Sequence, residues 1–267
     1  MRGAAHPAPA KGQSPLILFT NKNFHAVDLP AEFSSSHLDF YSHLCYTIKW
    51  SFIEIFIGGF LMKVDTLRLG ELAANCHIID CGEGICAAVD VGNDAEKLLS
   101  FLKSKNLTLG AILLTHGHYD HIGGVEEVRK ATGATVYIHE NDARMLEDAK
   151  LNLAAHITPL PYNQVTEYTA IQDGVEITVG SRIFKVLHTP GHTSGSVCYL
   201  TEDVMLSGDT LFCGSIGRTD LGGDPAQMKE SLRRLKALQK NYRVYTGHDY
   251  STTLDEERMS NPYMRNL

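Results

Sequence analysis

The sequence predicts an α+β fold, a four-layer αββα sandwich in which two sheets pack face to face with helices outside. Two observations carry this prediction. From Met62 onward the patterns follow the order strands, helix, strands, helix, and the second half repeats the layout of the first in outline. The apolar run Ala111–Leu114 lacks polar alternation, which is typical of a strand that is buried on both faces. Such a strand fits the interior of a sandwich.

Residues 1–61 differ in character from the rest of the chain. Met1–Pro15 is rich in Ala, Pro and Gly, which suits a disordered tail. The apolar stretch Trp50–Met62 is shorter than a membrane span of about 20 residues, and Glu54 interrupts it. Its surroundings also do not fit a signal peptide, so we expect neither a membrane segment nor secretion.

Two features suggest that translation starts later than residue 1. Met62 begins the first regular strand pattern, and Gly58-Gly59 can be encoded by a purine-rich run of the kind found in bacterial ribosome-binding sites. We expect residues 1–61 to reflect a mis-assigned start first, and a disordered or anchoring extension second. Residues 62–267 are expected to form the folded domain.

The first half of this domain alternates short strands with helices. Period-2 patterns bounded by Gly-containing turns predict strands, and Asp94 begins a helix with apolar residues at helical spacing. The expected segments are strands at 63–69, 75–81, 86–91 and 135–139, helices at 94–106, 123–132 and 142–148, and a loop at 151–165.

The second half contains a meander followed by a helix and a last strand. Asp224-Pro225 begins an amphipathic helix that is expected to end near Asn241. The expected strands lie at 175–179, 182–188, 197–200, 204–207 and 243–246.

Four metal-capable side chains follow the buried strand within six residues: His116, His118, Asp120 and His121. In an extended segment, residues two apart project to the same side, so His116 and His118 can close on one cation. Asp120 and His121 lie where the chain turns toward a helix, so they can point to a second cation. Imidazole and carboxylate suit zinc, iron or manganese, and the lack of a nearby thiolate argues against a closed structural zinc site. The pattern predicts a metal site.

The segment Thr115–His121 resembles the Thr-His-x-His-x-Asp-His signature of the metallo-β-lactamase-fold hydrolases. Three later segments match further family positions in the same order and contain His192, Asp209 and His248: Thr189-Pro-Gly-His-Thr-Ser-Gly195, Ser207-Gly-Asp-Thr-Leu-Phe212 and Thr246-Gly-His-Asp249. The resemblance runs from about Met62 to the C-terminus and implies the αββα sandwich. Within the superfamily the chain is most similar to the glyoxalase II (hydroxyacylglutathione hydrolase) branch of short bacterial type.

The resemblance implies a site with two divalent metal ions, zinc first, with iron or manganese as alternatives. It assigns His116, His118 and His192 to one metal, and Asp120, His121 and His248 to the other, with Asp209 as the bridge. Two such ions, two carboxylates and a bridging hydroxide leave the site net positive, which suits an oxyanion. A metal-bound hydroxide would attack a thioester or related acyl carbonyl, with Asp120 as the catalytic residue that orients the water or relays its proton.

Two segments are candidates for substrate selection. The loop at 151–165 would border the active site in this fold. Arg218, in Gly217-Arg-Thr-Asp220, could bind a substrate carboxylate or could brace its own loop through a salt bridge.

The chain departs from glyoxalase II proper at its C-terminus. That family carries a helical extension whose basic residues hold glutathione, whereas here 19 residues follow His248, with Arg258 and Arg265 as their only cations. We therefore expect glutathione thioesters to be hydrolysed but held weakly.

The composition is that of a globular protein, with 43% apolar and 21% charged residues. A net charge of −7 argues against a nucleic-acid partner, which would need a basic surface. No membrane partner is expected, the substrate is expected to be a small molecule, and the oligomeric state stays open. The six cysteines show no Cys-x-x-Cys pair and are expected to be reduced thiols of a cytoplasmic protein: Cys45, Cys76, Cys81, Cys86, Cys198 and Cys213. Cys213 lies near Asp209 in sequence but is expected to pack, and His188 is expected to support or pack rather than bind metal.

Other functions are weighed against a dinuclear hydrolase. Gly217–Asp220 is also similar to the persulfide dioxygenases, so a mononuclear iron persulfide dioxygenase is the alternative enzyme. Hydrolysis of β-lactams is disfavoured because no secretory signal is evident, and nucleic-acid processing because the chain is acidic. A diiron flavoprotein would want a carboxylate in place of His118. A non-catalytic metal-binding module is the alternative from another class, although no expected ligand is missing.

Overall fold

The computed structural model describes Ile17–Thr20, Asn23–Ala26 and residues 62–267 of the chain. The chain divides between Phe60 and Leu61 into two units. In the first unit, β1 (Ile17–Thr20) and β2 (Asn23–Ala26) pair antiparallel. The expectations for the rest of residues 1–61, and for Cys45, fall outside the described residues. The assignment of residues 1–61 and 62–267 therefore stays a prediction.

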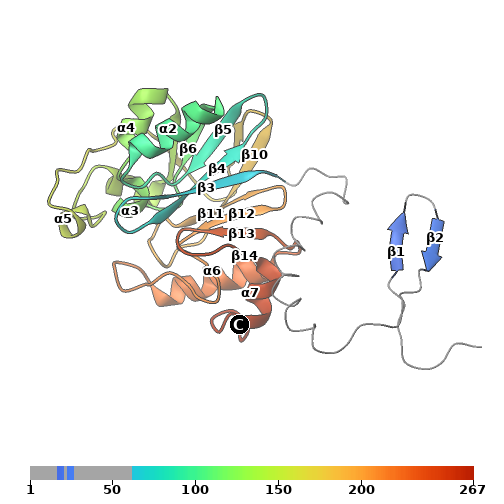
Figure 1. Ribbon diagram of the computed structural model, residues 1–267. Helices are drawn as coiled ribbons and strands as arrows, with labels where there is room; N and C mark the ends of the chain where they lie inside the picture. Colours follow the sequence, from blue (N-terminus) through green and yellow to red (C-terminus); the bar gives the residue numbers. More distant parts are fainter. Residues whose placement is uncertain (1–16, 21–22, 27–61) are drawn as a thin grey trace, which may run out of the picture. The chain divides into compact units, whose positions relative to one another are not determined.

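The second unit is built on two six-stranded sheets, with the orders β3-β4-β5-β6-β7-β8 and β14-β13-β12-β11-β10-β9 (Figure 1). The strands of the first sheet are β3 (Val64–Leu69), β4 (Ala74–Asp80), β5 (Ile85–Val89), β6 (Thr108–Leu113), β7 (Thr135–His139) and β8 (Thr169–Ile171). Those of the second are β9 (Glu176–Val179), β10 (Arg182–His188), β11 (Val197–Thr201), β12 (Val204–Gly208), β13 (Arg243–Thr246) and β14 (Thr252–Thr253).

Helices lie on the outer face of each sheet. In Figure 1, α2 and α4 (green) cover the first sheet, and α6 and α7 (orange to red) cover the second. The helical segments are α2 (Ala95–Lys105), α3 (Tyr119–Ile122), α4 (Val125–Thr132), the 3₁₀ helix η2 (Glu140–Leu146), α5 (Ala154–Ile157), α6 (Pro225–Ala237) and α7 (Leu254–Ser260). The predicted αββα sandwich is confirmed. Among the described residues, no helix has both the length and the apolar character that crossing a membrane requires.

Three apolar layers hold the sandwich together. The central layer lies between the sheets and includes Leu113 and Phe184. In one outer layer, Ile112 of β6, the strand that also carries Leu113, packs with Leu98 of α2. In the other outer layer, Leu232 of α6 packs against the second sheet. Because neighbouring residues of β6 enter different layers, both faces of this strand are buried, as its unbroken apolar pattern predicted.

Most expected segments agree with the structure to within two residues at each end, and α2 also agrees in its caps. The Asp94 side chain accepts a hydrogen bond from the Lys97 backbone, and Asn106 ends the helix in a left-handed conformation. Four expectations were wrong in extent. The strand expected at Ala111–Leu114 begins three residues earlier, at Thr108. A separate turn, α3, precedes α4, because the His121 carbonyl bonds the Val91 backbone N–H instead of continuing a helix. The expected loop at 151–165 contains α5, and α6 ends four residues before Asn241.

Besides α3 and α5, three short elements within residues 62–267 were not expected from the sequence: β8, β14 and α7. The helix α7 had a local signal, since Thr253 and Glu256 form a capping box at its start. The strands β8 and β14 have three and two residues, too few for a period-2 pattern to show.

The strand order brings the site loops to one end of the sandwich. β5 pairs parallel with β6, so Asp90 and the segment Thr115–His121 both follow the carboxyl ends of their strands, on the same side of the first sheet. β12 pairs parallel with β13, so Asp209 and His248 follow the neighbouring carboxyl ends of these two strands. Loops after parallel neighbours therefore collect the candidate residues at one place.

His77 ties the two sheets together beside these loops. It lies on β4, its Nδ1 is 2.9 Å from the Thr66 hydroxyl, and its Nε2 donates to the Thr246 carbonyl of the other sheet at 2.9 Å. Burial lowers the pKa of His77 to about 4, although the Thr246 carbonyl and Asp90 act in the opposite direction. The ring is therefore neutral in the folded protein at neutral pH.

This histidine is expected to make the metal-free protein sensitive to acid. The unfolded chain takes up a proton below its ordinary pKa of about 6.5, whereas the folded protein does so near 4. The stability that depends on neutral His77 is complete above pH 6.5 and is lost as the pH falls toward 4, an effect on the order of 3 kcal/mol. Denaturant unfolding of metal-free native and His77→Gln protein at pH 7 and pH 4.5 checks this. The native protein should lose more stability between these pH values; equal losses would contradict the assignment.

Candidate metal centre

The candidate centre begins where β6 ends, and buried Asp90 holds this segment in place. Asp90 Oδ1 accepts from the Thr115 backbone N–H at 2.8 Å, and Oδ2 accepts from the Thr115 hydroxyl at 2.7 Å. Since the Thr115 hydroxyl gives its proton to Asp90, its oxygen is the acceptor for His116 Nδ1, which lies 3.1 Å away. His116 therefore carries its proton on Nδ1 and has a lone pair on Nε2. That Nε2 is buried and has no hydrogen-bond partner.

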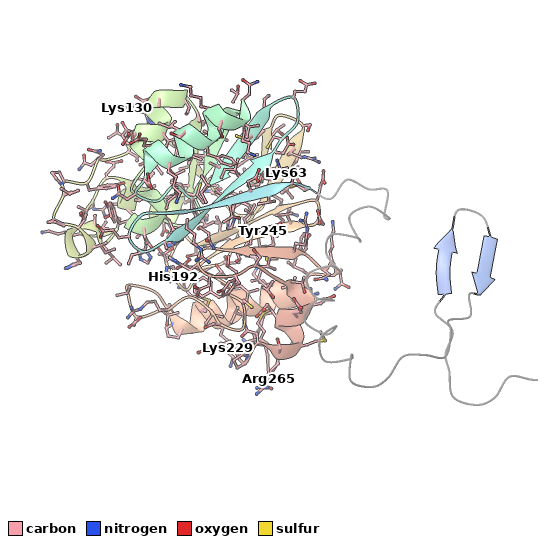
Figure 2. All side chains as sticks on the ribbon, in the orientation of Figure 1. Lys63, Lys130, His192, Lys229, Tyr245 and Arg265 are labelled. Atoms are coloured by element: carbon pink, nitrogen blue, oxygen red, sulfur yellow. The ribbon has the colours of Figure 1, made fainter. Side chains whose placement is uncertain are left out.

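His116, His118 and His192 form a first group, with one ring nitrogen of each within 4.8 Å of the others. His192, labelled in Figure 2, donates from Nδ1 to the Arg218 carbonyl at 2.7 Å, so its Nε2 also has a lone pair. That Nε2 lies 2.8 Å from His118 Nδ1. Neutral imidazoles that converge in this way could hold a transition-metal ion.

Asp120, His121 and His248 form a second group with the same spacing. His121 donates from Nδ1 to Asp90 Oδ2 at 2.9 Å, so its Nε2 faces the group. That nitrogen lies 3.2 Å from His248 Nε2 and 3.5 Å from Asp120 Oδ2, and His248 Nε2 lies 3.2 Å from the same Asp120 oxygen. Two imidazoles and a carboxylate are thus available to a second ion.

Asp209 lies between the two groups. Its Oδ1 is 3.4 Å from His121 Nε2 in the second group, and its Oδ2 is 3.5 Å from His192 Nε2 in the first. Its Oδ1 is buried and has no hydrogen-bond partner. Gly247 permits this placement, since a Cβ there would lie 2.1 Å from Asp209 Oδ1. One carboxylate therefore faces both groups.

The electrostatics differ between the two groups. Burial and neighbouring histidines lower the pKa of His118 to about 3 and that of His116 well below its ordinary value, so both rings are neutral. Burial acts against the charged form of His121, but Asp120, Asp209 and Asp90 outweigh it and raise its pKa to about 10. Burial likewise acts against the Asp120 carboxylate, yet His121 and His248 hold its pKa well below the ordinary range. The second group therefore has negative charge that a cation would neutralise.

The structure brings together all seven residues that the sequence singled out as metal ligands. Asp90, which the sequence reasoning missed, lies among them, within 4.8 Å of ring nitrogens of His116 and His121. Its two oxygens already accept from Thr115 and His121, so it orients the ring of His121. The sequence held one signal for it, a charged residue directly after the apolar strand β5.

A cleft of about 510 Å³ opens over both groups. Its walls are largely apolar, formed by Leu72, Leu153, Ile157, Phe212, Ile216 and Leu221. Leu153 and Ile157 belong to the segment at 151–165, so this segment borders the site as the sequence predicted. Apolar walls next to a charged centre favour a ligand with an apolar part and a polar reacting group.

Arg218 lines the cleft and pairs with Asp220 through two bonds of 2.6 and 2.7 Å, while its side chain is 61% exposed. This is the loop-bracing salt bridge that the sequence left as one alternative, and the role of Arg218 in substrate binding stays a prediction. Cys213 was expected to pack, but it is exposed and lines the cleft, so that expectation was wrong. His188 agrees with a supporting role, because its ring stacks on His139 at 4.0 Å and its Nε2 donates to the Ser194 carbonyl. Cys76, Cys81, Cys86 and Cys198 are free and buried, as expected.

Comparison with known families and proteins agrees with this geometry. The model of the Metallo-beta-lactamase superfamily matches residues 69–248. The chain is 35% identical over 207 residues to Probable metallo-hydrolase YqgX of Bacillus subtilis, covering 76% of this chain and 98% of that protein. It is 30% identical over 208 residues to Hydroxyacylglutathione hydrolase GloC of Haemophilus influenzae, covering 76% and 98%.

Solved structures are similar over the same region. BLEG-1 B3 metallo-beta-lactamase is 37% identical with a TM-score of 0.72, covering 76% of this chain and 99% of that one. TTHA1623 in a di-iron-bound form is 37% identical with a TM-score of 0.68, covering 75% and 100%. ETHE1 from Myxococcus xanthus is 28% identical with a TM-score of 0.63, covering 77% and 85%.

Proposed function

Because this chain belongs to the metallo-beta-lactamase superfamily and its relatives include metallo-hydrolases, we propose that it is a dinuclear hydrolase of thioesters or related acyl compounds. The observation that carries the proposal is the position of Asp209. A site for one ion needs no carboxylate shared between two ligand groups, whereas the Asp209 carboxylate lies within 3.6 Å of ring nitrogens in both groups: His192 of the first, and His121 and His248 of the second. The similarity to hydroxyacylglutathione hydrolase GloC supports the thioester as substrate class.

The residues present fit two divalent ions. His116 and His192 have lone pairs fixed by acceptors behind them, and His116 Nε2 and Asp209 Oδ1 are buried without a partner. Buried polar atoms normally have partners, so these two indicate ligand positions. We propose His116, His118, His192 and Asp209 for one ion, and Asp120, His121, His248 and Asp209 for the other. When bound, such a pair of ions would lower the pKa of a bound water and polarise a carbonyl oxygen.

The choice of metal rests on the donor set. Five imidazoles and two carboxylates suit zinc, which we place first, with iron and manganese as alternatives. The similarity to TTHA1623, solved in a di-iron-bound form, makes iron the closest competitor.

The protein's own residues shape the reaction around these ions. Asp90 orients His121 through its Nδ1–H, and the Arg218 carbonyl does the same for His192. Asp120 lines the cleft as a carboxylate, and we propose that it orients the attacking water as well as binding metal. The apolar cleft walls exclude bulk water from the reacting carbonyl and accept the acyl group or the departing thiol.

A substrate panel together with metal analysis tests this function. Among the described residues that line the cleft, Arg218 is the only Lys or Arg, and it is paired with Asp220. Glutathione carries two carboxylates, so S-lactoylglutathione should be hydrolysed with a high KM and a largely preserved kcat, and a short thioester without the peptide should be hydrolysed comparably well. Metal-replete protein should contain two ions per chain. Saturation at micromolar S-lactoylglutathione with no activity on the short thioester would contradict this account of the cleft.

The same samples distinguish the alternatives. The similarity to ETHE1 and the segment Gly217–Asp220 favour the persulfide dioxygenase as second candidate, which predicts one iron per chain and oxygen consumption with a glutathione persulfide. The similarity to BLEG-1 makes a β-lactam the third substrate to include. Two bound ions without turnover of any of these compounds would favour the non-catalytic metal-binding module.

A further inference from the structure

Asp142 is a buried carboxylate that the proposed reaction does not use. It lies on η2, directly after β7, and is 0% exposed. Within the described part of the chain, no cation lies within ion-pair distance of it. Burial raises the pKa of Asp142, while hydrogen bonds from Thr193, Gly117 and Gly195 act in the opposite direction. Burial of a carboxylate is costly unless hydrogen bonds offset the lost hydration, so the donors around Asp142 are needed to keep it in place.

Its hydrogen bonds reach two separate loops. Oδ2 accepts from the Gly117 backbone N–H at 3.0 Å and from the Thr193 hydroxyl at 2.6 Å. Oδ1 accepts from the Gly195 backbone N–H at 2.7 Å, and the Ser194 hydroxyl lies 3.5 Å away. Gly117 lies between His116 and His118, and Thr193 directly follows His192. One side chain therefore holds both loops that supply the three-histidine group.

Two glycines allow η2 to pack this closely on the two loops. A Cβ at Gly195 would lie 2.6 Å from Asp142 Cγ, and a Cβ at Gly117 would lie 2.6 Å from Met145 Cβ, also on η2. The 3₁₀ helix thus packs directly on the backbone of both loops. Side chains at these positions would push the loops away from η2 and from each other.

We propose that Asp142 is a positioning residue that sets the distance between His118 and His192, and thereby the metal affinity of the three-histidine group. This inference rests on the proposed metal centre. The chemistry of the donors requires a carboxylate, because each oxygen faces a backbone N–H whose direction is fixed. An asparagine has the same shape, but in either orientation its NH₂ group would face the N–H of Gly117 or Gly195.

The test measures metal affinity in Asp142→Asn protein against a matched control. Glu257 is also buried, and its carboxylate accepts from the Gly214 backbone N–H, Asn261 and Thr252. Glu257→Gln therefore disturbs a comparable network away from the histidine loops. In Asp142→Asn, one of the two ions should bind about 10–100-fold more weakly than in native protein, as is typical when a group behind a metal ligand is lost. Glu257→Gln should lose stability while both affinities stay native.

Two further readouts separate positioning from loss of charge or of stability. The visible absorption spectrum of bound cobalt(II) should change in Asp142→Asn, because the histidine nitrogens move. In metal-free Asp142→Asn protein, the Gly117 and Gly195 amides should exchange hydrogen faster than the same amides in metal-free Glu257→Gln protein. Thr193→Val keeps the charge of Asp142 and removes one hydrogen bond to it. It should therefore weaken the binding of the same ion less than Asp142→Asn does, and Thr193→Ser should have native affinity. Both Thr193 variants serve if Asp142→Asn does not fold.

The outcomes are distinguishable. Native affinities and a native cobalt spectrum in Asp142→Asn, with stability alone reduced, would overturn the inference and leave the proposed function intact. If Asp142→Asn cannot be purified folded, native affinity in Thr193→Val would overturn it in the same way. Native protein that binds no metal would overturn the proposed function and this inference together.

Discussion

Asp209→Ala is expected to lose metal from both ligand groups and to reduce kcat/KM by on the order of 10³-fold or more. The variant removes an oxygen that lies 3.4 Å from His121 Nε2 and one that lies 3.5 Å from His192 Nε2. Metal ions supply several kcal/mol of charge stabilisation in the transition state, and each 1.4 kcal/mol corresponds to about a factor of ten in rate. Steady-state kinetics on a thioester, with elemental analysis of the same protein, measures both effects.

A carboxylate far from the centre serves as the control for Asp209. Asp255 is exposed and pairs with Arg258 on α7. Asp255→Ala should keep native activity and metal content, because a surface ion pair contributes little to stability. Near-native activity and two bound ions in Asp209→Ala would show that the carboxylate does not bridge.

Removal of the metal ions is expected to abolish hydrolysis and to lower the melting temperature by about 10 °C. A ligand that binds only the folded state at about 1,000 times its Kd adds about 4 kcal/mol of stability, and for a domain of this size 1 kcal/mol shifts the Tm by about 2–4 °C. The physical reason lies in the centre itself. Without ions, the His116 Nε2 and Asp209 Oδ1 atoms stay buried and unpartnered, and three carboxylates surround His121.

Thermal unfolding with and without a chelator, followed by addition of zinc, iron or manganese, provides the measurement. The metal that restores both the Tm and the turnover is the physiological candidate. Asp209→Ala is the matched variant, since its Tm should respond much less to the chelator. An unchanged Tm after complete loss of the ions would mean that the histidine groups do not need metal to stay in place.

The amino-acid sequence by itself was enough to predict the fold of residues 62–267 and the candidate metal ligands. The sandwich follows from local periodicity: the alternation of strand and helix patterns survives in the structure because each pattern reports how one element buries its own apolar face. Four candidate ligands, from His116 to His121, could be named because their residue types and spacing suit a metal. The other three, His192, Asp209 and His248, were named from the resemblance to the metallo-β-lactamase-fold hydrolases. In the structure, all seven candidate ligands lie together at one end of the two sheets.

Other features were decided only by the tertiary structure. Asp142 has no local sequence signal, and the single charge of Asp90 directly after β5 does not show what Asp90 binds. Their partners lie 25 residues away for Asp90 and Thr115, and 53 residues away for Asp142 and Gly195. The exposure of Cys213 and the pairing of Arg218 with Asp220 likewise depend on how the loops close over the cleft. A sequence shows which side chains can accept a hydrogen bond or a metal ion, but the packing of the two sheets decides which donors reach them.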